Sequence, residues 1–462
     1  MLQKRDWRTS GIARFLLVCA LLAEFAGGCA SSRIDQPSPL PIPPPTATPV
    51  PTPGNSDTVD PKGCEVHLWH SLAGTKEAAL DALAARFETE NPFGIRLRLE
   101  YHGPLYDEVS VALSAGTPPD VVIAASDQIG EYVRSGAVAP LREYVASPTY
   151  GLNKAEQADL WPIALEAVSV GANARQLQAL LFDAHLVVMF YNATWLKRLK
   201  ADSPPASWEE FETVATAARD RKAGTWGCAF TSSGQVVANW VSSLGGTIVD
   251  AQLQAPALDS AEAMAALSSL RALADKGCIR CTSESGADRA ELAGEKALFT
   301  FGTTQDISAY TAAILNTKTK KPRFDWSVAA MPHTAGQPVS LVQGSMLTIL
   351  HTTPSQQLAA WLFLKWLLEP ANDAQWALAS GSLPLRKSSI GLPEMQSYLK
   401  QNPQYATACE LLAHAQAQPA LPHWGEVRAL LADAAASVCL TGEEPEAALA
   451  AADHAANSLV LR

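Results

Sequence analysis

Residues 180–192 read Leu-Leu-Phe-Asp-Ala-His-Leu-Val-Val-Met-Phe-Tyr-Asn, and they lie near the middle of the folded part of the chain. A short apolar run, rich in β-branched and aromatic residues and followed by polar ones, predicts a buried strand rather than a helix. Strand-like and helix-like segments alternate from Cys64 up to it, and the alternation restarts at Thr194. We therefore interpret the stretch as a bridge between two lobes, with Asp183 and His185 facing the crevice. The alternative is that both are solvated loop residues.

The N-terminus differs in kind from the rest of the chain. Basic residues precede an apolar run over residues 15–23 that is too short to span a bilayer, which predicts a secretory signal peptide over residues 1–28. The small residues directly before Cys29 resemble the lipobox of bacterial lipoproteins. Cys29 is therefore the expected lipidation site, and the mature protein is expected outside the cell, anchored to a membrane.

Residues 29–63 form a tether rather than a domain. Nine of the seventeen residues from Pro37 to Pro53 are proline, and such a segment stays extended. The whole chain of 462 residues is long enough for two or three domains. Its formal net charge of −11 argues against nucleic acid as a partner. No stretch after Cys29 approaches twenty apolar residues, so no transmembrane helix is expected.

The cysteines after the lipobox are even in number, which permits disulfides in an exported chain, although fifteen pairings are possible. They are Cys64, Cys228, Cys278, Cys281, Cys409 and Cys439. A bond between Cys409 and Cys439 is favoured because these residues flank two predicted helices that a short connection would fold back on each other. Cys278 and Cys281 have the spacing of half a zinc site or of a redox motif, but no second pair accompanies them. Structural cysteines are the favoured interpretation.

The first half of the chain has the pattern of a parallel sheet. Strands are predicted near residues 66–70, 95–99 and 121–125, with helices between them that end at Asn91 and Gly116. This βαβαβ order predicts an α/β fold with helices on both faces of the sheet.

In such a sheet the ligand binds beyond the carboxyl ends of the strands. One predicted strand ends in Trp69, His70 and Ser71, which offer an aromatic face and hydrogen-bonding groups. Asp127 follows another strand and offers a carboxylate. The alternative interpretations are a core tryptophan for Trp69 and a helix N-cap for Asp127.

The second half repeats the alternation. Ser207 opens a helix with a capping box. A strand over residues 226–230 runs into the polar loop 231–235, and a strand over residues 296–301 runs into the polar turn 302–306. The loop 231–235 is where a second lobe would meet the crevice.

Six phrases in a fixed order resemble extracellular solute-binding proteins of the maltodextrin-binding and glycerol-3-phosphate-binding type, the substrate receptors of ABC importers. The similarity extends from Cys64 to the C-terminus. The phrases are Trp69-His70-Ser71, residues 86–92, 116–122, 190–192, 205–211 and 295–299.

The resemblance implies a two-lobed fold of the periplasmic-binding-protein type II, in which each lobe is a largely parallel sheet flanked by helices and hinge strands join the lobes. It assigns residues 64–184 and 303–350 to the first lobe, and residues 185–302 and 351–462 to the second. Strands near residues 328–332 and 345–350 are expected to return the chain to the first lobe.

The resemblance also implies a set of ligand-binding residues. His185 stands where the maltodextrin relatives have a contacting glutamate, and the loop after residue 230 lacks the tryptophans of the glycerol-3-phosphate relatives. Trp424 precedes Arg428 by four residues, a spacing like that of a sugar-stacking tryptophan in the maltodextrin relatives. The expected ligand-binding residues are Trp69, His70, Ser71, Asp127, His185, Gln235, Thr303, Gln305, Gly344 and Trp424.

The function implied is capture of a carbohydrate and its delivery to permease and ATPase subunits by a monomeric receptor, with no cofactor and no metal. A receptor for a glycerol phosphate derivative and a sensory sugar-binding lipoprotein are the alternatives. A secreted glycoside-active enzyme is disfavoured, because the chain has no His-Glu-x-x-His, no Gly-x-Ser-x-Gly and no phosphate-binding glycine-rich loop.

Overall fold

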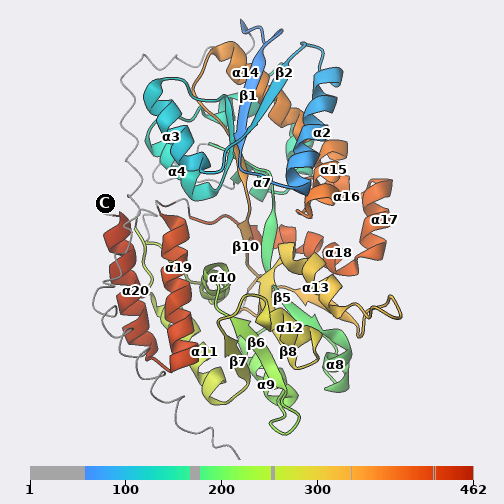
Figure 1. The fold of residues 1–462 in the computed structure, drawn as a ribbon, viewed down its shortest axis with the longest axis vertical. Coiled ribbons are helices and arrows are strands. Elements are labelled where there is room, and N and C mark those ends of the chain that lie inside the picture. The colour runs from blue at the N-terminus through green and yellow to red at the C-terminus, as the bar shows by residue number, and fades with distance from the viewer. Residues whose placement is uncertain are drawn as a thin grey trace, which may run out of the picture. The chain divides into compact units, whose positions relative to one another are not determined.

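The computed structural model describes residues 58–166, 177–250, 255–334, 336–419, 421 and 423–460. The predicted signal peptide, the lipidation site Cys29 and the proline-rich part of the tether lie outside these residues. Within them, the strands form two sheets connected by many helices (Figure 1). None of the helices in the described ranges has the length and apolar character that crossing a membrane requires.

The first sheet has five strands in the order β2-β1-β3-β11-β4. The predicted βαβαβ unit is confirmed, because β1 pairs in parallel with both β2 and β3. β11 is antiparallel to β3 and to β4, so the sheet is parallel only in its first three strands. The bounds are β1 Glu65–His70, β2 Arg96–Tyr101, β3 Val121–Ala124, β4 Leu180–Leu181 and β11 Met346–Ile349.

Helices cover both sides of this sheet, with α3 and α4 on one side of β1 and β2 and with α2 and α15 on the other (Figure 1). In α2, Leu83 and Phe87 recur at helical spacing and are buried, and the Phe87 ring lies 5.0 Å from that of Phe363 in α14. We call this sheet and the helices packed around it the first lobe. Its helices are α2 Thr75–Glu90, α3 Leu105–Ala115, α4 Ser126–Arg134, α5 Leu141–Ala146, α6 Lys154–Asp159, α7 Ile163–Glu166, α14 Pro354–Leu367, α15 Pro370–Ser380, α16 Lys387–Ile390 and α17 Pro393–Gln401. α18 Pro403–Glu410 follows them and packs against Trp326–Ala329, a strand of the second sheet.

The second sheet has the order β12-β10-β5-β8-β6-β7, and β9 also pairs with β5. β6 is parallel to β7 and β8, whereas β5 is antiparallel to β8, β9 and β10. The bounds are β5 His185–Asn192, β6 Trp226–Thr231, β7 Ile279–Thr282, β8 Ala297–Thr303, β9 Trp326–Ala329, β10 Ser340–Gln343 and β12 Ala415–Gln416.

A second hydrophobic cluster packs against this sheet and defines the second lobe. In its centre the rings of Trp208 and Trp240 stack 4.2 Å apart. The predicted N-cap is confirmed, since the Ser207 hydroxyl accepts from the backbone N–H of Glu210. The remaining helices are α8 Ala193–Arg198, α9 Trp208–Ala218, α10 Gly234–Ser243, α11 Ala261–Asp275, α12 Ala287–Ala293, η3 Thr304–Asp306, α13 Ile307–Ile314, η4 Leu411–His414, α19 Trp424–Ala436, η5 Ser437–Thr441 and α20 Pro445–Val460.

The stretch 180–192 is the expected bridge, but it is two strands rather than one. β4 belongs to the first sheet and β5 to the second, so residues 182–184 cross between them. A second crossing runs from β10 to β11 through Gly344 and Ser345. The two crossings are hydrogen bonded, because the Ser345 carbonyl accepts from the N–H groups of Phe182 and Asp183 at 3.0 and 3.1 Å. We call these two segments the hinge.

The division of the chain between the lobes differs from the expected one in two places. β9 and β10 lie within residues 303–350, expected in the first lobe, yet both pair with β5 in the second sheet. α14 and α15 lie within residues 351–462, expected in the second lobe, yet α14 packs against β1 and β11 of the first sheet and α15 packs against α2. The reason is that β11 returns the chain to the first sheet and α14, which follows it, packs back onto that sheet. The full domain boundaries stay a prediction.

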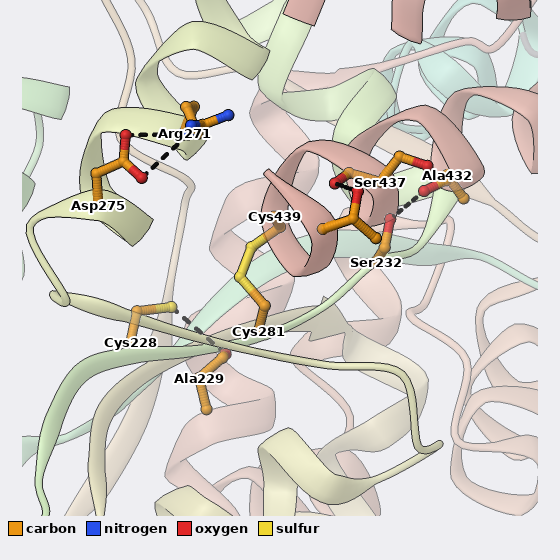
Figure 2. The surroundings of a disulfide bond; sticks show 10 residues. Cys228, Ala229, Ser232, Arg271, Asp275, Cys281, Ala432, Ser437 and Cys439 are labelled. Atoms are coloured by element: carbon orange, nitrogen blue, oxygen red, sulfur yellow. Dashed lines mark hydrogen bonds and ion pairs between the residues drawn. A yellow bond between two sulfur atoms is a disulfide. The ribbon is translucent and has the colours of Figure 1, made fainter. Parts of the chain in front are cut away.

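The predicted disulfide between Cys409 and Cys439 is wrong. Cys439 in η5 is bonded to Cys281 on β7, with a Cα–Cα distance of 5.9 Å (Figure 2). Cys409 is a buried free thiol. α18 and α19 do not fold back on each other, because β12 pairs with β10 of the second sheet between them. The bond therefore ties the strand at the end of the second sheet to the segment after α19.

Candidate functional site

The carboxyl ends of the parallel strands in both sheets meet at the hinge. In the first sheet β3 ends at Ala124, which is in register with Met346, the first residue of β11. In the second sheet β8 ends at Thr303, which is in register with Val187, two residues into β5. Both crossings leave from these ends. In α/β sheets, ligands bind at the carboxyl ends of the strands. The hinge therefore joins the ligand-binding edge of the first sheet directly to that of the second.

A cluster of polar side chains lies beside the hinge, and we call it the hinge cluster. His185 is in register with Gln343 of β10. From α19, Arg428 Nη1 donates to Gln343 Oε1 at 2.9 Å and to Gln418 Oε1 at 3.1 Å, and Trp424 Nε1 donates to Gln418 Oε1 at 2.9 Å. The cluster therefore gathers side chains from two strands, a loop and a helix.

Several buried polar atoms of the hinge cluster lack a hydrogen-bond partner among the described residues. They are Nδ1 of His185, Nε2 of Gln343 and Nε of Arg428, whereas Nε2 of His185 lies 3.2 Å from Asp183 Oδ1. A buried polar group without a partner costs about 1–3 kcal/mol. Hydroxyl groups or charged oxygens of a ligand would satisfy these donors and acceptors, so the arrangement suits a polar ligand.

A buried ion pair lies next to this cluster. Lys76 in the first turn of α2 pairs with Asp183, whose Oδ1 is 3.2 Å from His185 Nε2. Burial by itself would raise the pKa of Asp183, but the contacts with His185 and Lys76 outweigh it and hold the pKa below its ordinary value. Burial lowers the pKa of Arg428, and the Asp127 carboxylate opposes this.

Asp127 joins the two lobes. It lies in the first turn of α4 in the first lobe, and its Oδ2 accepts from the backbone N–H of Gly425, in the first turn of α19, at 3.2 Å. A carboxylate at a helix N-terminus is favoured by the helix dipole. Asp127 is therefore engaged by the protein itself, and a ligand that binds this carboxylate must compete with α19.

We expect Asp127→Ala to free the N-terminus of α19. A hydrogen bond to a charged acceptor contributes about 1.5–3 kcal/mol, so the amides at the start of α19 should exchange with deuterium roughly tenfold faster or more, since 1.4 kcal/mol corresponds to tenfold. Hydrogen exchange followed by mass spectrometry measures this. Asp107→Ala removes a first-turn carboxylate from α3 and serves as the control. Equal exchange in α19 of both variants would contradict the contact.

Trp424 is not exposed, as a tryptophan that stacks on a sugar would be. Its side chain is 1% exposed and belongs to the second hydrophobic cluster. Trp69 stacks on His102 with ring centroids 4.0 Å apart. His70 is buried, burial lowers its pKa, and its Nδ1 has no partner among the described residues, whereas Ser71 is exposed.

The remaining candidates have local roles. Gln235 Oε1 accepts from the Ser233 hydroxyl at 2.8 Å, and the Thr303 hydroxyl donates to Asp306 at 3.1 Å. Gln305 is exposed. Whether any of them contacts a ligand stays a prediction.

Gly344 has a steric role in the hinge. Its φ is +135°, and a Cβ built there would lie 1.4 Å from the carbonyl oxygen of Asp183. The two crossing segments can approach this closely only because residue 344 has no side chain.

Residue patterns alone did not reveal Gln343, Gln418 and Lys76. Gln343 directly precedes the predicted Gly344, which is the one signal that could have pointed to it. The described residues contain no group of three or more His, Cys, Asp or Glu side chains that could hold a metal ion. The candidate site contains hydrogen-bonding, charged and aromatic groups.

Two α/β lobes joined by short hinge segments, with polar side chains gathered at the hinge, define a protein that encloses a small solute. The sequence profile described as bacterial extracellular solute-binding protein matches residues 82–407. The chain belongs to this family.

Relatives of this chain include receptors for different solutes. The chain is 24% identical over 368 residues to the maltotriose-binding protein of Pyrococcus abyssi, covering 79% of this chain and 75% of that protein. It is 22% identical over 432 residues to the sn-glycerol-3-phosphate-binding periplasmic protein of Escherichia coli strain K12, covering 86% and 92%.

A solved structure supports the fold. The cyclic alpha-maltosyl-1,6-maltose binding protein from Arthrobacter globiformis superposes with a TM-score of 0.70 at 19% identity, covering 86% of this chain and 98% of that chain. The likeness confirms the two-lobed periplasmic-binding-protein fold.

Proposed function

We propose that this chain captures a carbohydrate, a mono- or oligosaccharide, between its two lobes and delivers it to an ABC importer. The observation that carries the proposal is the hinge cluster, where buried donors and acceptors of His185, Gln343 and Arg428 have no partner among the described residues. The Pyrococcus abyssi relative, named for maltotriose, supports a sugar as the ligand class.

In this proposal a sugar acts by bridging the lobes. Its hydroxyls hydrogen bond to His185 and Gln343 at the hinge, while aromatic faces such as Trp69 supply apolar contact. A ligand that makes more contacts in the closed arrangement shifts the equilibrium towards it. Closure then signals to the permease subunits that the receptor is loaded.

The proposal also covers where the protein works and which proteins it works with. We infer that the protein works outside the cytoplasm as a monomer, anchored through an acylated Cys29 and held away from the membrane by residues 29–63. Permease and ATPase subunits are its partners, and it catalyses no reaction. A sensory receptor without transport would use the same lobes.

A glycerol phosphate derivative is the second candidate ligand. Arg428 is half-buried with its Nε unpartnered among the described residues, and a guanidinium is well suited to phosphate oxygens. The Escherichia coli relative, named for sn-glycerol-3-phosphate, supports this alternative.

A thermal-shift screen of residues 58–462 against oligosaccharides, polyols and glycerol phosphates tests the proposal. A ligand at one hundred times its Kd adds about 2.7 kcal/mol to the free energy of unfolding. We expect a sugar to raise Tm and Gln343→Ala to abolish the shift, while Gln401→Ala on the exposed surface of α17 leaves it unchanged. Trp424→Ala is unsuitable because it removes a core side chain. A shift with a glycerol phosphate alone would replace sugar as the ligand class.

A further inference from the structure

Lys76 lies in an electrostatically unfavourable place for its own helix. It is the second residue of α2, where the positive end of the helix dipole disfavours a cation. Its side chain is nevertheless only 19% exposed and pairs with Asp183, whose side chain is 6% exposed. The position of Lys76 is therefore explained by Asp183 rather than by the helix.

Asp183 is held rigidly where the chain passes between the sheets. Its N–H donates to the Ser345 carbonyl at 3.1 Å, and its own carbonyl lies against Gly344. With its backbone fixed on both sides, the carboxylate of Asp183 can reach Lys76 from α2 and His185 from β5. Asp183 thus connects a helix of the first lobe to the first residue of a strand of the second.

The contact between Asp183 and His185 links this arrangement to ligand binding, because His185 is a candidate ligand-binding residue. Nε2 of His185 is 3.2 Å from Oδ1 of Asp183, and neither atom has another hydrogen-bond partner among the described residues. Each is buried, so a small rotation that completes a hydrogen bond between them satisfies both. Nδ1 of His185 is then the ring nitrogen left for another group.

We propose that Lys76 and Asp183 are positioning residues that hold the His185 ring with its Nε2 proton towards Asp183, so that Nδ1 is presented to the ligand. The inference rests on the proposed function, in which His185 contacts the ligand. A carboxylate beside one ring nitrogen selects the tautomer and orientation of the imidazole. Lys76 acts through Asp183 by keeping that carboxylate charged.

The groups around Asp183 predict how the charge of its carboxylate depends on pH. The groups that face Asp183 are the titratable ring of His185 from β5 and the charged Lys76 from α2, and Arg428 from α19 reaches Gln343, the cross-strand neighbour of His185. Because the folded-state pKa of Asp183 is lowered, its stabilising charge is fully present above the ordinary aspartate pKa and is lost as pH falls through the lowered value. Without Lys76, burial favours the protonated acid at higher pH than in the wild type.

The first test needs no ligand. In protein labelled with ¹⁵N-histidine, the ring nitrogen signals report which nitrogen carries the proton, and His185→Gln assigns the His185 signals. We expect Nε2 of His185 to be protonated in the wild type and its signal to shift in Asp183→Asn. A neutral ring with its proton on Nδ1 in the wild type overturns the inference, whatever the ligand is.

The second test uses the ligand that the thermal-shift screen identifies. We expect Lys76→Met to raise Kd at least tenfold, with a loss that grows as the pH falls, and Lys76→Arg to restore Kd to within about threefold. Lys400→Met removes an exposed lysine from α17 and is the control. A Lys76→Met protein that is less stable but keeps the wild-type Kd and pH profile overturns the inference. If no solute shifts Tm, the proposed function fails, and the ring-nitrogen signals still decide this inference.

Discussion

Replacing Gly344 with alanine should disrupt the hinge and cause one of the largest losses of stability of any single substitution in the described part of the chain. The new Cβ would lie 1.4 Å from the Asp183 carbonyl oxygen, which belongs to the backbone and cannot rotate away. Overpacking of this kind costs about 1–3 kcal/mol or more, and a non-glycine residue at positive φ adds about 1–3 kcal/mol. We expect a total loss of about 3–5 kcal/mol, measured by urea unfolding.

Gly336→Ala is the matched control for this substitution. Gly336 has a φ of +128°, close to the +135° of Gly344, but a Cβ there meets nothing within 4 Å. The difference between the two variants therefore isolates the close approach of the two crossing segments. Equal losses in both variants would show that backbone strain alone, and not the contact with Asp183, makes glycine necessary.

Removing the disulfide bond between Cys281 and Cys439 should lower the free energy of unfolding by as much as Gly344→Ala does. The two cysteines are 158 residues apart in the chain, and the loop-entropy relation gives about 5 kcal/mol as an upper value for a loop of that size. We expect Cys281→Ser and Cys439→Ser each to lower the free energy of unfolding in urea by most of this amount. The double variant should lose little more, because either substitution removes the whole bond.

Reduction of the wild-type protein provides the control. Dithiothreitol should lower its stability to that of the double variant and leave the double variant unchanged. The described cysteines other than this pair, namely Cys64, Cys228, Cys278 and Cys409, are free, so the denatured, unreduced domain should show four thiols. Six reactive thiols before reduction, or stability in Cys281→Ser equal to that of the wild type, would refute the pairing.

Much of the fold could be predicted because local signals mark it. The alternation in β1 and the apolar run of β3 gave strands at the correct places, and Gly116, in the left-handed conformation, ends α3 as expected. The crossing within residues 180–192 could not be located in this way. Residues on both sides of it are buried, so the hydrophobic pattern is continuous while the sheet changes.

Other features could not be predicted correctly, because they depend on contacts between distant parts of the chain. The pairing of Cys439 with Cys281 depends on where α19 packs, and proximity in the sequence favoured Cys409 instead. A tryptophan near a helix start has the same pattern whether it faces a ligand or, like Trp424, the core. The partner of Asp183 is Lys76, which no spacing rule connects to it.

The place of β11 in the first sheet has a consequence for biosynthesis. β3 ends at Ala124, but the strand that covers its edge begins at Met346, and β4 pairs with that same strand. A sheet completed by such a distant segment forms slowly and late. The first sheet therefore stays incomplete until residue 349 has left the ribosome.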